Sequence, residues 1–282
     1  MTAILPTQRV EPSTALVALA SKSDGNPERT VRVVSTVSEL ESYVHKWEAL
    51  GRDAVDLNPF YEPWSVMPAL KGSLGADNIQ FVFVVDPANE AEAVCGFFPL
   101  QYDSRFRGLP IGVYRLWSHK HCPVRMPLLK HGEERACLVA LLNWLHSQAS
   151  RASFFELQAV NSESAFVTHL LGELDQRRAQ FHETACAERV VMSSSGSDSD
   201  AYFSNAVGKK RWKKLNKLRR QLIERGTLAT ELLLSPDELE NWLGDFLRLE
   251  AKGWKGRNGT ALVANPAERE FFLILQRYGD RF

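Results

Sequence analysis

Two kinds of hydrophobic pattern alternate along the chain. Short uninterrupted apolar runs, such as Phe81-Val-Phe-Val-Val85, predict buried strands. Segments in which leucines recur every three or four positions, as between 138 and 145, predict helices with one buried face. We therefore expect strands at 31–34, 81–85, 93–100, 113–117, 154–160, 181–192 and 227–234. We expect helices at 38–50, from 59, and at 133–148, 162–178, 201–226, 235–253 and 265–282, and Gly208 could break the helix at 201–226.

Residues at the segment ends support these boundaries. Ser38 and Glu41 have the spacing of a capping box, and Asn265-Pro266 places an N-cap before a first-turn proline. A turn sequence joins the strands 81–85 and 93–100, which predicts a hairpin. Because that hairpin lies among alternating strands and helices, we expect an α/β (α+β) fold with a mixed sheet flanked by helices.

Composition changes along the chain suggest where its parts begin and end. Residues 1–30 hold three prolines, a glycine and no sustained period, so we expect a flexible N-terminal arm. The serine-rich stretch 193–200 is typical of a linker. We therefore expect a first domain over 31–192 and a second over 201–282, since 282 residues suffice for about two domains.

The overall composition excludes several classes of protein. The chain is 44% hydrophobic and 24% charged, which argues against disorder, and it has no apolar run long enough to cross a membrane. Its four cysteines form no CxxC pair, which favours a reducing, cytoplasmic location. His119, His121, Cys122 and His131 lack the paired spacing of zinc ligands, so we expect no metal site.

A net charge of zero hides one strongly basic segment. Residues 201–230 contain nine bases and one acid, and eight of those bases lie between Lys209 and Arg220. Trp212, Leu215 and Leu218 fall on one face of the expected helix. One interpretation is a solvated basic face whose leucine stripe packs on a sheet. The alternative is a non-enzymatic module that binds an anionic glycan precursor, an acidic partner or, less plausibly, nucleic acid.

Familiar nucleotide and hydrolase motifs are absent. The chain has no GxGxxG, GxxxxGK[ST], GxSxG or HExxH. The stretch Leu249-Glu-Ala-Lys-Gly-Trp-Lys-Gly-Arg-Asn-Gly-Thr260 instead combines charged side chains, a tryptophan and three glycines. Glycines allow close approach of a ligand, and tryptophan with basic neighbours can contact an anionic group. A helix C-terminus would have the same composition, so both interpretations stay open.

Several segments together resemble a known family. They are Asn58-Pro-Phe-Tyr-Glu-Pro-Trp64, Gly96-Phe-Phe-Pro-Leu100, Leu116-Trp-Ser-His-Lys-His-Cys122 with Pro127-Leu128, and the stretches 209–226 and 250–262. In their order and spacing they are similar to GNAT-superfamily acyltransferases of the cellulose-biosynthesis-protein-like acetyltransferase group, which is related to Fem-type peptidyltransferases. The resemblance covers residues 31–282 and implies two GNAT-like halves around a cleft. It also implies an acyl-CoA, such as acetyl-CoA, as co-substrate, and N- or O-acyl transfer to a small-molecule or glycan acceptor in polysaccharide or cell-envelope metabolism.

The resemblance also suggests which residues form the site. Glu250 would be the catalytic base or would position the amine, and Trp254 and Lys255 would contact substrate. The acceptor cleft would be lined by Tyr61, Trp64, His119 and His121. Each has a structural alternative, since Glu250 could form a surface ion pair with Lys255, and an aromatic cluster or a lone histidine often belongs to the core.

One departure from the family concerns the acyl-CoA donor. The usual pyrophosphate loop, [Gln/Arg]-x-x-Gly-x-[Gly/Ala], is absent, and the nearest string, Arg105-Phe-Arg-Gly-Leu-Pro110, ends in proline. We therefore expect a C-terminally shortened member whose second GNAT-like half is incomplete, and an inactive fragment without an acyl-CoA site is a third interpretation. On that basis Phe271, Phe272, Leu275 and Phe282 would form an exposed apolar patch.

Overall fold

The computed structural model of the protein describes residues 9–10, 12–18, 29–72, 74, 78–88, 92–190, 207–229 and 236–279. The chain divides into two compact units. The small unit comprises Met1–Val10 and Glu188–Trp242, and the sheet unit comprises Glu11–Ala187 and Leu243–Phe282. Residues 243–282 therefore group with the central sheet, although the sequence suggested a division at 193–200. The two GNAT-like halves stay a prediction.

The small unit contains a two-stranded sheet and a basic helix. Strand β1 (Arg9–Val10) pairs antiparallel with β10 (Arg189–Val190). Helix α6 (Lys209–Glu224) has no buried residue, and its leucines at 215, 218 and 222 are 42–54% exposed. The leucines expected in a packed face are therefore exposed. The strand expected at 227–234 is not formed at 227–229, and its remaining residues lie outside the described part of the chain.

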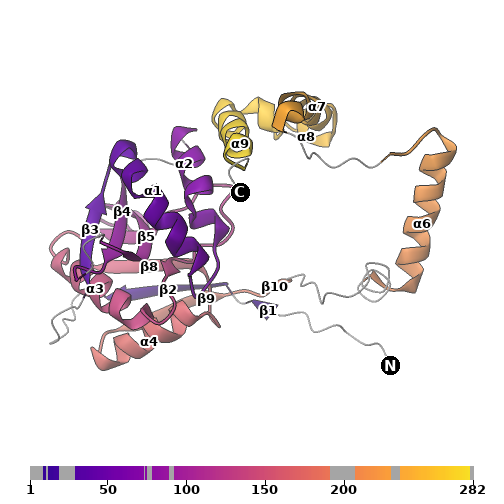
Figure 1. Ribbon diagram of the computed structural model, residues 1–282. Coiled ribbons are helices and arrows are strands. Elements are labelled where there is room, and N and C mark those ends of the chain that lie inside the picture. The colour runs from indigo at the N-terminus through magenta and orange to yellow at the C-terminus, as the bar shows by residue number, and fades with distance from the viewer. Residues whose placement is uncertain are drawn as a thin grey trace. The chain divides into compact units, whose positions relative to one another are not determined.

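The sheet unit is built on an eight-stranded mixed sheet (Figure 1). Its order is β3-β4-β5-β6-β8-β2-β9, with β7 paired to β5. Strands β6 and β8 are parallel, and the other pairs are antiparallel, so the expected mixed sheet and the β4–β5 hairpin are confirmed. The strands are β2 (Pro12–Ala18), β3 (Thr30–Val34), β4 (Ile79–Val85), β5 (Val94–Asp103), β6 (Val113–Leu116), β7 (Leu128–Leu129), β8 (Phe154–Asn161) and β9 (Phe181–Cys186).

Strand β2 corrects the expectation of a flexible arm. It lies between β8 and β9 and pairs with both, and its Ala15 and Val17 are each 1% exposed. The prediction of a flexible arm was wrong for residues 12–18. This seven-residue strand shows only a short apolar run in the sequence, because a strand paired on both sides needs neither a helical nor an alternating pattern. The expected strand 181–192 is likewise divided into β9 and β10, and β7 was not predicted.

Helices cover both faces of the sheet (Figure 1). Side chains of β4 alternate between the two cores, with Phe81 and Phe83 on one face and Val82 and Val84 on the other. The phenylalanine face packs against α1 (Val37–Arg52) and α2 (Pro63–Lys71), and the valine face packs against α3 (Glu134–Ser147) and α4 (Ala165–Gln176). No helix of the described residues has the length and apolar character that a membrane crossing requires.

The start of α1 shows how local chemistry sets an element's boundary. Thr36, and not Ser38, is the N-cap, and it forms a reciprocal capping box with Glu39. The Thr36 hydroxyl accepts from the Glu39 N–H at 3.2 Å, which satisfies a donor that the first helical turn leaves free. The short helix expected from 59 is two elements, a 3₁₀ helix (Pro59–Tyr61) capped by Asn58 and then α2.

Three further helices belong largely to the sheet unit. They are α7 (Leu239–Lys252), α8 (Trp254–Arg257) and α9 (Pro266–Gly279), with a 3₁₀ turn (Leu262–Ala264) before α9. Helix α9 packs on α2 where Gly72 ends that helix, and a Cβ there would meet the Phe271 N at 3.0 Å. Phe271 is 5% exposed in the core under α2. The expected exposed patch is therefore wrong for Phe271, and Phe282 lies outside the described residues.

Candidate active site

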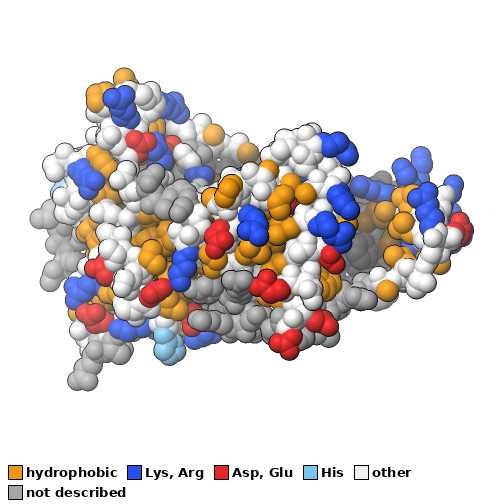
Figure 2. Space-filling view, turned by 90° about the horizontal axis from the view of Figure 1, so that it is seen from above, with side chains coloured by type: hydrophobic (Ala, Val, Ile, Leu, Met, Phe, Trp, Pro, Cys, Tyr) orange, Lys and Arg blue, Asp and Glu red, His pale blue; other side chains and the backbone are white. Residues whose placement is uncertain are grey.

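A cavity of about 610 Å³ lies among α2, the loop after β6 and helices α7–α9. All of its lining residues belong to the sheet unit. Seen from above, that part of the surface shows hydrophobic side chains gathered between acidic and basic ones (Figure 2). The lining consists of an aromatic and aliphatic wall with two acid–lysine pairs, and comprises Phe60, Trp64, Ser65, Lys120, His121, Phe246, Glu250, Trp254, Lys255, Thr260, Leu262, Glu268, Phe271, Phe272 and Leu275.

The first acid–lysine pair joins α7 to the segment that follows it. The Lys255 ammonium lies 2.6 Å from Oε1 of Glu250, and the Leu262 N–H donates to Oε2 at 2.8 Å. The Lys255 ammonium, joined by that N–H, lowers the pKa of Glu250 against the opposing effect of burial. Gly256 makes this close turn possible, because a Cβ there would lie 1.7 Å from the Ala251 carbonyl oxygen.

The second pair joins the loop after β6 to α9. Nζ of Lys120 lies 2.8 and 3.0 Å from the two carboxylate oxygens of Glu268, whose side chain is 10% exposed. Asn265 caps α9 and donates to Oε1 of Glu268 at 3.2 Å. Nε2 of His121 lies 3.5 Å from Oε2. The hydrogen bond from Lys120 is the main cause of a lowered pKa at Glu268.

An aromatic ring fixes the position of His121. Its imidazole stacks on Phe271 with the ring centroids 5.4 Å apart and the planes at 13°. The backbone N–H of His121 donates to Nδ1 of His119 at 3.3 Å, which sets the turn of the loop. Across the cavity, Trp64 lies in the first turn of α2 and donates through Nε1 to Glu62 at 3.1 Å.

The structure brings five of the seven predicted site residues into this cavity: Trp64, His121, Glu250, Trp254 and Lys255. Tyr61 does not line the cavity. It is fully buried, and its hydroxyl donates to the Trp117 carbonyl, so burial raises its pKa well above the usual value. Tyr61 was predicted to line the cleft because several aromatic residues follow Asn58, and their spacing does not show which ring is buried in the core.

His119 also lies outside the lining. Its ring packs between Trp117 and Phe271, with centroid distances of 5.3 and 5.2 Å. Burial, and next the neighbouring His121, lower the pKa of His119 to about 4, so the ring is neutral at pH 7. Two residues apart in one loop, the histidines thus differ in surroundings, and only His121 reaches the cavity.

Sequence reasoning missed several lining residues. Glu268 and Lys120, which form the second acid–lysine pair, were not among the predicted site residues. Phe60 and Phe246 gave no signal that separated them from core residues, while Phe272 and Leu275, expected in an open patch, are half-buried at the cavity wall. The sequence signal that could have indicated these lining residues was a charged residue next to each predicted aromatic cluster.

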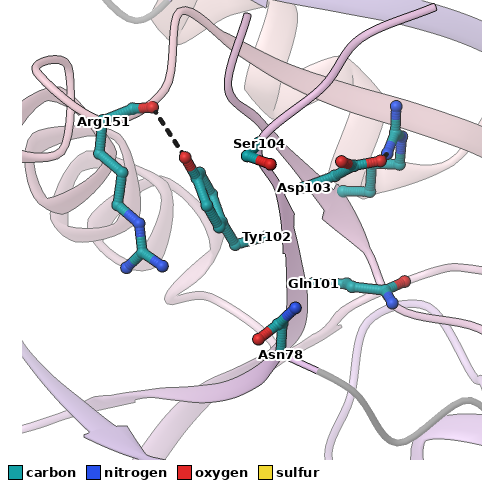
Figure 3. A pocket seen from close by; sticks show the side chains of 7 residues that line it. Asn78, Gln101, Tyr102, Asp103, Ser104 and Arg151 are labelled. Carbon is teal, nitrogen blue, oxygen red and sulfur yellow. Dashed lines mark hydrogen bonds and ion pairs between the residues drawn. The ribbon is translucent and has the colours of Figure 1, made fainter. Parts of the chain in front are cut away.

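A second cavity, of about 290 Å³, lies where the end of β5 meets β6 (Figure 3). Arg115 forms ion pairs with Asp103 at 2.9 Å and with Glu156, so both carboxylates are engaged. The Arg151 guanidinium lies 3.8 Å above the Tyr102 ring, and the Tyr102 hydroxyl donates to the Arg151 carbonyl at 3.2 Å. The arginines of this smaller cavity are therefore engaged in structural contacts, so we take the larger cavity as the candidate site.

The string nearest to a pyrophosphate loop is a closed turn. Phe106 and Leu109 exchange backbone hydrogen bonds of 3.1 and 3.0 Å, and Arg107 and Gly108 between them have φ values of 50° and 84°. Two positive φ angles in a two-residue turn are typical of a tight hairpin. The N–H groups of Phe106 and Leu109 are paired within the turn and so are not free to bind phosphate.

Within the described residues, no group of three or more His, Cys, Asp or Glu side chains is placed to hold a metal ion. Cys122, beside the two histidines, is 5% exposed, and its thiol donates to the Val124 carbonyl at 3.2 Å. Burial raises the pKa of this thiol to about 11, which favours the neutral form over a metal-binding thiolate.

Comparison with known proteins gives distant structural neighbours. No family model matches the chain, and no curated protein matches it. A functionally unknown conserved protein from Staphylococcus epidermidis is 10% identical, with a TM-score of 0.38, over 62% of this chain and 59% of its own. A GCN5-related N-acetyltransferase from Kribbella flavida is 14% identical, with a TM-score of 0.31, over 63% of this chain and 56% of its own. This chain thus spans less than two thirds of either neighbour, and the narrower family group stays a prediction.

Proposed function

We propose that the protein transfers an acyl group from an acyl-CoA thioester to an amine or hydroxyl acceptor that binds in the larger cavity. The observation that carries the proposal is the meeting, in that cavity, of five residues that the motif resemblance selected from three distant segments. Trp64 comes from α2, His121 from the loop after β6, and Glu250, Trp254 and Lys255 from the α7–α8 region.

The chemistry of the cavity suits an acceptor. Trp64 and Trp254 offer flat apolar surfaces for a sugar ring or an aromatic body, and the carboxylates of Glu250 and Glu268 offer acceptors for an ammonium or hydroxyl group. The pyrophosphate of coenzyme A requires N–H donors or free cations, whereas Lys120 and Lys255 are ion-paired. We therefore assign the cavity to the acceptor and not to the pyrophosphate.

The test is acceptor-dependent release of coenzyme A from acetyl-CoA. The acceptors are 2-phenylethylamine, glucosamine and glucose, which separate amine from hydroxyl and aromatic from sugar. Substitution Trp254→Ala should raise KM for the acceptor about tenfold, the equivalent of ~1.4 kcal/mol of lost stacking. The matched control is Trp242→Ala, which removes another exposed tryptophan that does not line the cavity. Absence of turnover with every acceptor, together with no acetyl-CoA binding by calorimetry, would refute the proposal.

Helix α6 favours a second candidate function, the binding of a polyanion. All its basic side chains between 209 and 220 are exposed. Phosphate contacts by so many bases would make affinity fall steeply with salt. Titration of a fluorescein-labelled RNA at two salt concentrations tests this, with the charge reversals Lys213→Glu and Lys217→Glu as controls. Binding that is absent, or that salt does not change, excludes this second function.

A further inference from the structure

Glu250, the acid first expected to act as base, is held by two structural contacts. Its Oε1 accepts from Lys255, and its Oε2 accepts from the Leu262 N–H. Its side chain is only 7% exposed. To accept a proton, this carboxylate would have to lose a charge-assisted hydrogen bond that ties α7 to the following turn. Its geometry is therefore that of a residue that holds one wall of the cavity in place.

Glu268 and His121 have a different arrangement. Glu268 is fixed by Lys120 and Asn265, and its Oε2 faces Nε2 of His121 at 3.5 Å. That nitrogen is shielded from solvent and forms no hydrogen bond, so its contact with Glu268 is an ion-pair distance, and 30% of the His121 side chain is exposed. The exposed part of the side chain is therefore outside Nε2, and His121 lines the cavity. Phe271 stacks on the ring and limits its rotation.

We infer that His121 is the general base for the acceptor and that Glu268 is the residue that positions it. The inference rests on the proposed function and deepens it, because it names the proton acceptor of that reaction. The negative charge of the nearby Glu268 carboxylate favours the tautomer with its proton on Nε2, and that tautomer has an unprotonated lone pair on Nδ1. A carboxylate that orients a histidine in this way is a recurring device of acid–base catalysis.

The step balances as follows. The acceptor nitrogen or oxygen forms a bond to the thioester carbonyl carbon while its proton moves to Nδ1 of His121. The carbon–sulfur bond then breaks, and the sulfur of coenzyme A receives a proton from the imidazolium. The products are the acylated acceptor and the free thiol, and His121 is neutral again. No oxidant or further reactant is needed.

The charges around His121 are few. Glu268 approaches from α9 and carries the negative charge that stabilises the imidazolium. Lys120 precedes His121 in the loop and neutralises part of that charge, and the neutral His119 lies with its ring centroid 6.2 Å away. Substitution Glu268→Gln keeps the shape of this group but removes its charge, so it tests the pairing without removing a side chain.

The experiment measures kcat and KM for coenzyme A release, with the best acceptor of the panel, in His121→Gln, Glu268→Gln and Glu250→Gln. We expect His121→Gln to lower kcat about 100-fold or more, with KM changed less than threefold. Glu268→Gln should lower kcat about tenfold with KM changed less than threefold, because the imidazolium formed in the reaction loses its counter-charge. His45→Gln, on the exposed surface of α1, should match the wild type.

Two readouts keep the inference separate from folding defects. Added imidazole should restore activity to His121→Ala, and thermal unfolding should show that each variant is folded. In addition, ¹⁵N chemical shifts should show His121 as the Nε2–H tautomer in the wild type and as a mixture in Glu268→Gln. This measurement requires no turnover.

The outcomes are distinguishable. If the wild type releases no coenzyme A with any acceptor, the proposed function fails and the inference fails with it. If the wild type is active and folded His121→Gln keeps full kcat, only the inference is overturned. The same holds if Glu250→Gln loses as much kcat as His121→Gln is expected to lose, because that result assigns the base to Glu250.

Discussion

Phe271 offers a direct test of how the cavity is built. This residue attaches α9 to the rest of the sheet unit, because it is 5% exposed and belongs to the core under α2. Its ring also contacts His119 and His121. The next residue, Phe272, lies on the same helix but is half-buried at the cavity wall, where it stacks on Phe246 with a centroid distance of 5.1 Å. Phe271→Ala and Phe272→Ala therefore remove the same type of side chain from two different environments.

The expected magnitudes follow from burial. Removal of a fully buried phenylalanine costs about 3–5 kcal/mol. Because α9 packs with one face only, we expect a value near the lower end for Phe271→Ala, about 3 kcal/mol, which corresponds to roughly a 100-fold change in the equilibrium for detachment of α9. Phe272 loses less contact, and we expect about 1 kcal/mol for Phe272→Ala.

Hydrogen–deuterium exchange of the α9 amides is the appropriate assay, because it reports the free energy of local opening and not only that of global unfolding. Exchange in residues 266–279 should accelerate about 100-fold in Phe271→Ala and only a few-fold in Phe272→Ala, while the β4 amides serve as an internal control. Equal acceleration in the two variants would refute the reasoning, since it would mean that α9 is not anchored through Phe271.

Further predictions concern Gly112, Tyr61 and Glu268. A Cβ at Gly112 would lie 2.0 Å from the Arg151 carbonyl oxygen, so Gly112→Ala should cost about 2–3 kcal/mol, and an unchanged urea midpoint would contradict this. Tyr61→Phe removes a buried hydrogen bond to Trp117 and should cost about 1–2 kcal/mol with activity within twofold; lost activity at unchanged stability would restore a substrate role. Because the pKa of Glu268 is lowered from 4.5, its contribution is present above that pH and is lost as the pH falls through the lowered pKa, so the Tm difference between wild type and Glu268→Gln should shrink as the pH is taken from 7 to well below 4.5. A Tm difference that stays constant would show that the ion pair adds nothing.

Elements with a strong local signal were predicted correctly. The leucine period of α3, the apolar runs of β4 and β8 and the hairpin between β4 and β5 are all present. These features depend on a few neighbouring residues and on burial of one or both faces, which a single sequence shows. Strand β2 was missed because its position in the sheet is set by pairing with β8 and β9, which follow it by more than 130 residues in the sequence.

The candidate site shows the same division between local and distant information. The motif resemblance selected both the loop around His121 and the stretch around Glu250, and the structure brings them to one cavity. It could not show that Glu250 would be held by Lys255 and the Leu262 N–H, since these contacts follow from the turn at Gly256. A pattern of residue types shows which residues belong to a site. The role of each residue depends on which of its lone pairs already accept hydrogen bonds.

That dependence explains why the base is assigned to a histidine instead of to the acid first expected. Both acids in the cavity are paired with a lysine, so neither is a free proton acceptor at pH 7. Glu268, however, also faces the imidazole of His121 at 3.5 Å, so its negative charge can stabilise the imidazolium that forms when this ring accepts a proton. The helix that brings Glu268 is the helix that Phe271 anchors. Stability of α9 on α2 and activity of His121 should therefore change together. Gly72 does not line the cavity, and Gly72→Ala, which crowds α9 at Phe271, should lower both.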